Sequence, residues 1–386
     1  MPFYQSKGKI PKKRHTVFKN PRGGIYYEEL VSREGFSYIY SNLYHLNMPT
    51  QVIKLDKFKK NEDKYTFIKD DHKPYHFLSD ESSKLMLYNK DVSISTFYLD
   101  STYTKKDLIG NIFYRNGDCD LLIYIQMGNG ILKTNYGNLV FDEGDYIVIP
   151  RGVIFQYYLN SDVVSGLCID SKSPVETPSK YRNRVGQLLE HSPFCERDIK
   201  VPDLQDPIDK DGEFIVKVKL ESGSKSFIYK KHPFDVVGWD GYYFPWILSI
   251  NDFEPITGSI HQPPPVHQTF QAKGFVVCSF VARLFDYHPD AIPAPYPHSN
   301  VDSDEVIFYS KGNFMSRKGV SKGSITYHPM GLPHGPQPGK YEESIGKKKT
   351  DELAVMIDTF DPLYITDAAK KCSDNDYPLS WVENNN

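Results

Sequence analysis

The chain has 386 residues, of which 39% are hydrophobic and 25% are charged, a composition typical of a globular protein of one or two domains. The net charge of −3 gives no general attraction to nucleic acid or to an anionic membrane, and the basic segment 7–15 is interpreted as a solvated terminus. No apolar run reaches membrane-spanning length, and the first residues lack the apolar core of a signal peptide. Five scattered cysteines without a CxxC pair fit reduced thiols, so we expect a cytoplasmic protein. From the net charge and the short apolar runs we expect no nucleic-acid partner and no membrane partner.

The first hundred residues are predicted to form short strands. Aromatic and β-branched runs, such as 23–30, 36–44 and 92–99, alternate with polar segments that contain glycine. The whole chain contains 28 Tyr, 23 Phe, 27 Pro and 26 Gly, which favours strands and tight turns over helical bundles.

Residues 111–160 contain the clearest β-meander of the first half, with apolar runs separated by glycine turns. A connector rich in Ser, Pro and Asp follows, and residues 214–231 alternate around a glycine as in a β-hairpin. Residues 232–297 then mix strands with proline-rich loops of the kind that line the mouth of a barrel. We therefore predict an N-terminal β-rich domain over 1–215 and a C-terminal domain over 216–386.

The segment from His298 to Gly335 carries the residues that point to chemistry. Glu305 opens a buried strand, a second strand follows at 324–327, and a Pro-Gly bend then leads to His334. Paired strands bring distant residues to one face of a sheet, so the two histidines and Glu305 are expected to converge. Two imidazoles and one carboxylate on one side of a metal ion leave other positions open, as in non-haem Fe(II) oxygenases.

The spacing of this segment resembles the two short motifs of the cupin superfamily. Glu305 precedes Gly312 by seven positions, and the second motif, G-x5-P-x-G-x2-H, is completed by Gly323, Pro329, Gly331 and His334. The alternative is that these glycines and prolines are ordinary hairpin turns and that the histidines lie on polar loops.

The same frame occurs once more in the first half of the chain. Gly128 aligns with Gly312, and Gly144, Pro150 and Gly152 align with Gly323, Pro329 and Gly331. In this alignment Tyr114, Leu121 and Phe155 stand where the second copy has His298, Glu305 and His334. Because none of these three residues offers an imidazole or a carboxylate, we expect a metal-free first barrel and one metal site in the second.

The second half resembles the homogentisate 1,2-dioxygenases. The resemblance is carried by residues 233–241, by the His261 segment up to Gly274, by the segment from His298 to Glu305, and by residues 328–336. It implies a mostly β, bicupin-like fold of two β-barrel or jelly-roll units with extra strands and few short helices. It also implies a homo-oligomer.

The resemblance also implies roles for individual residues. The family's Fe(2+) ligands fall on His298, Glu305 and His334, and its catalytic histidine falls on His261. Its histidine ahead of the last ligand falls on His328, so we place His328 and His334 in the substrate pocket. Tyr296 stands close to the first ligand in the sequence, so its phenol is a further candidate for substrate binding, with simple packing in the loop as the alternative.

Some positions depart from the family or leave alternatives open. His298 and Glu305 are one residue further apart than in well-known members, so Asp304 is a competing ligand. His267 lies close to His261 and is a second candidate for the base. Asp240 replaces a histidine and Phe314 replaces a tyrosine, which puts the exact aromatic substrate in question.

The resemblance implies an Fe(2+) enzyme that opens the ring of homogentisate with O2 to give 4-maleylacetoacetate, a step of tyrosine and phenylalanine catabolism. The alternatives are a gentisate-like or other hydroquinone-acid dioxygenase, a metal-dependent isomerase, and a non-catalytic metal-binding cupin. The isomerase would work without O2, and the metal-binding protein would not need His261.

Overall fold

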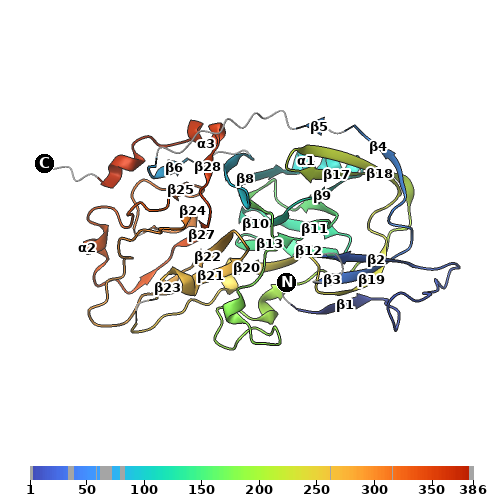
Figure 1. Ribbon diagram of the computed structural model, residues 1–386, viewed down its shortest axis with the longest axis horizontal. Coiled ribbons are helices and arrows are strands. Elements are labelled where there is room, and N and C mark those ends of the chain that lie inside the picture. Colours follow the sequence, from blue (N-terminus) through green and yellow to red (C-terminus); the bar gives the residue numbers. More distant parts are fainter. Residues whose placement is uncertain are drawn as a thin grey trace. The chain divides into compact units, whose positions relative to one another are not determined.

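The computed structural model describes residues 3–33, 39–57, 59–60, 72–78, 83–260, 262–314 and 316–381. Strands make up most of the regular structure there, and the described part of the chain contains only three α-helices, each of nine residues or fewer (Figure 1). The predicted fold class, mostly β with few short helices, is confirmed. None of the helices in these ranges is long and apolar enough to cross a membrane.

The chain divides into two compact units that interleave along the sequence. Unit 1 comprises Met1–Lys64, Leu99–Ser165 and Glu196–Leu248, and unit 2 comprises Tyr65–Tyr98, Gly166–Cys195 and Ser249–Asn386. Strands β8 (Val92–Asp100), β15 (Val163–Ser171) and β20 (Trp246–Ser249) run across the limits of these units.

The predicted boundary at residue 215 does not coincide with these limits. Residues 216–248 lie in unit 1, because β17 (Asp211–Leu220) pairs with β9 (Ile112–Asn116) and with β18 (Gly223–Lys231). Residues 65–98 lie in unit 2, where β6 (Tyr75–Phe77) pairs with β25 (Ile325–His328). Neither pairing is local in sequence, so turn and linker signals do not reveal it. Whether each unit folds as a domain stays a prediction.

Unit 1 contains two complete sheets, ordered β1-β19-β3-β2 and β12-β11-β14-β9-β17-β18-β4 with β5 on β18, and a β16-β20-β13-β10 array. Its other elements are β1 (Gln5–Gly8), β2 (Tyr27–Ser32), β3 (Tyr40–His45), β4 (Val52–Leu55), β5 (Lys59–Lys60), α1 (Ser101–Ile109), β10 (Asp120–Met127), β11 (Gly130–Thr134), β12 (Gly137–Phe141), β13 (Asp145–Ile149), β14 (Phe155–Leu159), η2 (Glu196–Asp198), β16 (Ile199–Lys200) and β19 (Val236–Gly241).

Unit 2 is built on a six-stranded sheet of order β21-β22-β27-β24-β25-β6, most of it drawn in orange and red in Figure 1. Strands β23 and β26 pair separately, and β7 pairs with β8 and β28. Its other elements are β7 (Leu85–Tyr88), η1 (Ser179–Tyr181), η3 (Ile250–Asp252), η4 (Pro264–His267), β21 (Gln268–Gln271), β22 (Phe275–Phe280), β23 (Arg283–Leu284), β24 (Asp304–Lys311), α2 (Lys340–Ser344), β26 (Lys349–Thr350), β27 (Leu353–Thr359), β28 (Tyr364–Ile365), α3 (Asp367–Lys371) and η5 (Tyr377–Trp381).

The internal repeat predicted from the sequence is present in the strand register of the two units. Leu121 pairs with Ile149 in unit 1, and the aligned Glu305 pairs with His328 in unit 2. Tyr114 pairs with Phe155, and the aligned His298 and His334 form a bridge. The three pairs of aligned glycines all have positive φ, from 74° to 98°, a backbone conformation that glycine adopts without strain.

At the first of these turns, glycine is also required by close approach of the backbone. A Cβ on Gly312 would lie 2.4 Å from the carbonyl oxygen of Asp351, and one on Gly128 would lie 2.2 Å from that of Val163. Because both units have this requirement, the shared glycines reflect turn geometry. The residues at the ligand positions differ between the copies, so turn geometry does not account for them.

His45 is a buried residue of unit 1 held between two carboxylates. Its Nδ1 lies 2.7 Å from Oδ1 of Asp235, and its Nε2 lies 2.9 Å from Oε2 of Glu29. Burial alone would lower the pKa of His45, but the two carboxylates outweigh burial and raise it to about 9. The imidazolium with both nitrogens protonated is therefore the stable form at neutral pH.

The unfolding free energy is expected to decrease as the pH rises from about 6.5 to 9, because the folded protein then loses the His45 proton. The pKa of His45 is higher in the folded protein than in the unfolded chain. Its contribution to the unfolding free energy is therefore fully present below pH 6.5 and lost as the pH passes 9. The size of this contribution is on the order of 3 kcal/mol. Urea unfolding at several pH values, with His45→Gln as the non-titrating comparison, measures it. Parallel profiles for the two proteins would contradict the assignment.

Candidate metal centre

The two predicted histidine ligands are brought together by a backbone bridge in unit 2. The amide of His298 donates to the carbonyl of His334 at 2.8 Å, and the amide of His334 donates to the carbonyl of His298 at 2.9 Å. His298 lies ahead of β24, and His334 lies beyond the Pro329–Gly331 bend that ends β25. The bend returns the chain to the His298 segment, as the G-x5-P-x-G-x2-H pattern predicts.

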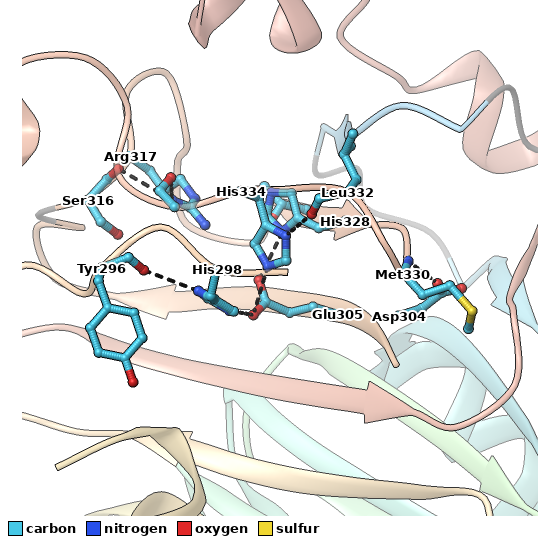
Figure 2. A network of polar contacts seen from close by, with 12 residues as sticks. Tyr296, His298, Asp304, Glu305, Ser316, Arg317, His328, Met330, Leu332 and His334 are labelled. Atoms are coloured by element: carbon cyan, nitrogen blue, oxygen red, sulfur yellow. Dashed lines mark hydrogen bonds and ion pairs between the residues drawn. The ribbon is translucent and has the colours of Figure 1, made fainter. Parts of the chain in front are cut away.

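The predicted triad of His298, Glu305 and His334 converges on one point. Oε2 of Glu305 lies 3.8 Å from Nε2 of His298 and 3.6 Å from Nε2 of His334. One ligand atom from each of the three residues lies within 4.8 Å of the others, and Figure 2 shows the three side chains pointing toward one another. This spacing suits a common metal ion, with three ligands on one side of it.

Hydrogen bonds fix which ring nitrogen of each histidine faces the centre. Nδ1 of His298 lies 3.2 Å from the carbonyl of Tyr296, and Nδ1 of His334 lies 2.9 Å from the carbonyl of Leu332. A carbonyl only accepts, so each Nδ1 carries the proton and each Nε2 presents a lone pair. Nε2 of His334 is buried without a hydrogen-bond partner in the described structure. A metal ion would satisfy that atom, so the residues present fit a metal centre.

Glu305 is the buried anion of the cluster. Burial alone would raise the pKa of its carboxyl, but the hydrogen bond from His328 and the nearby imidazoles of His298 and His334 hold that pKa well below its usual range. The carboxylate is therefore ionised at neutral pH and available as a ligand.

His328 contacts the carboxylate oxygen of Glu305 that does not face His298 and His334. Its Nδ1 lies 2.9 Å from Oε1 of Glu305, its Nε2 lies 3.2 Å from the hydroxyl of Tyr377, and its ring stacks on His334 with centroids 4.7 Å apart. Burial lowers the pKa of His328 to about 4, so the contact with Glu305 is a hydrogen bond from a neutral imidazole and not an ion pair. Sequence resemblance placed His328 in the substrate pocket. In the structure it is fully buried, and both ring nitrogens are used within the protein.

The competing ligand Asp304 faces away from the cluster. Successive residues of a strand point to opposite faces, so Asp304 and Glu305 cannot both reach one point. The oxygens of Asp304 accept hydrogen bonds from the Tyr327 hydroxyl at 3.0 Å and from the amides of Met330 and Leu363, each at 2.7 Å. Asp304 therefore ties the loops beyond β25 and β27 to the sheet, and Figure 2 shows it on the far side of Glu305 from the histidines.

A cavity of about 400 Å³ opens beside the triad. Its apolar lining comes mainly from one face of the six-stranded sheet and from nearby loops: Pro263, Phe280, Pro293, Pro295, Ile307, Phe314, Ala354 and Met356. Its polar lining is Gln262, His267, Arg283, Tyr296, His298, Asn300, Glu305, Tyr309, Ser316, Arg317, Glu352 and Asp358. A cavity that combines apolar side chains with polar groups beside a ligand cluster suits a small aromatic molecule that carries polar substituents.

The remaining predicted site residues differ in whether they line the cavity. Tyr296 lines the cavity and is half-exposed, and its role as a substrate contact stays a prediction. His261, the predicted base, lies outside the described residues. Its competitor His267 is buried and lines the cavity, and its Nδ1 has no hydrogen-bond partner among the described residues. Phe314 lines the cavity with an apolar ring, whereas Asp240 lies on β19 of unit 1 and accepts a hydrogen bond from Tyr4.

Sequence reasoning missed three residues around the centre. Tyr377 lies in the short helix η5 and Arg317 lies in a loop, and no local signal in the sequence places either residue beside the ligands. The position of Asp358 could have been predicted from strand periodicity. Ala354, Met356 and Asp358 are every second residue of β27, so they lie on one face, and Asp358 lines the cavity directly opposite Glu305. Burial, with Glu305 opposite, raises the pKa of Asp358 to about 7.

Comparison with known proteins identifies related chains. Residues 83–250 match the family described as "Homogentisate 1,2-dioxygenase N-terminal". "Putative dioxygenase SSO1533" of Saccharolobus solfataricus is 43% identical over 395 residues, which cover 99% of each chain. Homogentisate 1,2-dioxygenases of Bradyrhizobium diazoefficiens and Legionella pneumophila are each 26% identical over 292 residues.

These alignments with named homogentisate 1,2-dioxygenases cover 72% of this chain and 64% and 67% of the relatives, so this chain spans about two thirds of their length. Among solved structures, the cupin 2 conserved barrel domain protein of Leptotrichia buccalis matches with a TM-score of 0.32 and 11% identity, over 81% of this chain and 98% of that one. The full-length relative and the matched family region agree with the resemblance found in the sequence. The chain belongs to the homogentisate 1,2-dioxygenase family.

Proposed function

We propose that this protein is an Fe(2+)-dependent dioxygenase that opens the ring of a dihydroxy-aromatic acid. Homogentisate is the proposed substrate and 4-maleylacetoacetate the proposed product. The observation that carries the proposal is the convergence of His298, Glu305 and His334 beside a cavity that is large enough for an aromatic ring.

Unit 2 supplies both the residues that would hold the ion and the groups that orient them. Nε2 of His298, Nε2 of His334 and Oε2 of Glu305 would hold the ion, and the carbonyls of Tyr296 and Leu332 keep the two rings in the required tautomer. A bound ferrous ion would supply a template for substrate and O2 and would stabilise negative charge on their oxygens. Because a single carboxylate ligand leaves the centre with positive charge, it favours a substrate hydroxyl that has lost its proton.

The cavity wall orients the ring and excludes water. Ile307, Phe314 and Met356 offer apolar surface on which an aromatic ring packs. Removal of the hydroxyl proton requires a base beside the cavity. The assignment of His261 to this role rests on sequence resemblance alone.

Oxygen consumption tests the proposal. Protein loaded with Fe(II) without air and then mixed with homogentisate in aerated buffer is expected to consume O2. Gentisate and other hydroquinone acids belong in the panel, because Phe314 cannot donate the hydrogen bond that a tyrosine would. No uptake with any member of the panel would refute the proposal.

His261→Ala separates an enzyme from a metal-binding protein on the same frame. The enzyme is expected to lose most of its turnover while it keeps its iron. A protein whose only function is to bind metal would show no change in any measured property.

A further inference from the structure

A buried cation, Arg317, lies beside the metal ligands and forms no ion pair with a carboxylate of the described residues. Only 8% of the Arg317 surface is exposed, and the residue lines the cavity that Glu305 and His298 also line. Its Nη1 donates to the carbonyl of Gly335 at 2.5 Å, and Gly335 directly follows the ligand His334. Figure 2 shows Arg317 near the three ligands, and its hydrogen bond to Gly335 connects it to the loop that carries His334.

The hydrogen-bonding capacity of Arg317 is incompletely used. Its described hydrogen bonds go to the carbonyls of Gly335 and Ser316 and to the Tyr309 side chain, and its guanidinium lies over the Trp381 ring at 5.9 Å. Nε is buried without a partner, and Arg317 forms no ion pair with a carboxylate in the ranges that the structure describes. A buried guanidinium in this state is costly unless something else pairs with it.

The second arginine of the cavity provides a contrast. Nη1 of Arg283 lies 3.7 Å from Oε1 of Glu352, which also lines the cavity, so the charge of Arg283 is balanced within the protein. Both arginines line the same cavity. Of the two, Arg283 contacts a carboxylate, whereas Arg317 contacts none among the described residues.

The charges of the proposed metal centre and of Arg317 indicate which ligand would fit. Two neutral imidazoles, the Glu305 carboxylate and a divalent ion carry one positive charge together, and Arg317 adds another beside them. A substrate with one deprotonated hydroxyl and one carboxylate would neutralise both charges. Because Arg317 is bonded to the residue next to His334, the carboxylate must lie on a short arm of the ring or on the ring itself.

We propose that Arg317 binds the substrate carboxylate and thereby selects hydroquinone acids over uncharged hydroquinones. This inference rests on the proposed function and adds to it the residue that determines specificity. A planar guanidinium suits the task, because it binds a carboxylate through two parallel hydrogen bonds.

The test compares an acid with an uncharged analogue of nearly the same size. The turnover pair is homogentisate and its primary amide, 2,5-dihydroxyphenylacetamide. The binding pair is 2-hydroxyphenylacetate and its amide, titrated calorimetrically into Fe(II)-loaded protein without oxygen. The variants are Arg317→Met, which keeps most of the volume, Arg317→Lys, which keeps the charge, and Arg283→Met as the matched control in the same cavity.

Wild type is expected to prefer the acid over the amide by about 10- to 100-fold in both kcat/KM and affinity, the usual size of a charge-assisted hydrogen bond. Arg317→Met should abolish this preference by weakening the acid alone, and Arg317→Lys should restore part of it. Arg283→Met should leave the ratio between acid and amide unchanged.

Each other outcome is decisive. If Arg317→Met weakens acid and amide equally, or if wild type shows no preference, the inference is overturned and Arg317 only supports the fold. If wild type binds the acid through Arg317 but consumes no O2, the proposed function fails while the carboxylate site stands.

Discussion

Substituting Glu305 by Gln is expected to abolish tight binding of iron and, with it, ring cleavage. The change removes the one anionic ligand while keeping the size of the side chain, and it replaces a charge-assisted hydrogen bond from His328 by a weaker one. Wild type should hold about one iron per chain after Fe(II) loading and desalting, as three protein ligands of this kind imply, and the variant close to none. Elemental analysis gives the result directly.

Asp304→Asn is the matched control, because Asp304 is the neighbouring buried carboxylate on the opposite face of β24. The Asp304→Asn protein should keep the iron. Its free energy of unfolding should fall by roughly 1–3 kcal/mol, because the new side-chain NH2 group is a donor that faces the backbone N–H donors of Met330 and Leu363. Iron retained in Glu305→Gln together with iron lost in Asp304→Asn would reverse the ligand assignment.

Phe155→Ala is expected to destabilise unit 1 by about 3–5 kcal/mol without changing the iron content. Phe155 occupies the position that aligns with His334, but it is buried against Tyr114 and Tyr157, with ring centroids 6.1 and 5.6 Å apart. Its removal leaves a cavity in a packed core and touches no metal ligand. Urea unfolding measures the loss, and elemental analysis of the folded protein measures the iron.

Tyr158→Ala is the comparison for this experiment, because Tyr158 is an exposed aromatic residue of the same strand, β14. It should cost less than about 1 kcal/mol. Iron lost from well-folded Phe155→Ala protein, or two irons per wild-type chain, would mean that unit 1 also holds a metal ion.

The repeat and the ligand cluster could be predicted from the sequence because both depend on local patterns. Gly128 and Gly312 mark the same tight turn, which their positive φ and close backbone contacts require. The distance from Glu305 to Gly312 sets the phase of β24, and strand alternation then separates Glu305 from Asp304.

What the sequence did not predict depends on contacts between distant segments. The pairing of β6 with β25 and of β17 with β9 interleaves the two units, and no turn signal records such a pairing. Tyr377 reaches His328 from 49 residues further along the chain, and Arg317 reaches the ligand loop through the carbonyl of Gly335. Each of these contacts follows from tertiary packing, which residue spacing in the sequence does not encode.

The central claim is that this chain is a ring-cleaving dioxygenase, and a single turnover under ¹⁸O₂ tests it most directly. Fe(II)-loaded protein is mixed with homogentisate in ¹⁸O₂-saturated buffer, and the product is analysed by mass spectrometry. The claim predicts one ring-opened product that contains both atoms of a single O2 molecule. Oxidation to the quinone with ¹⁸O in peroxide or water, or recovery of unchanged homogentisate and of every related hydroquinone acid, would contradict it.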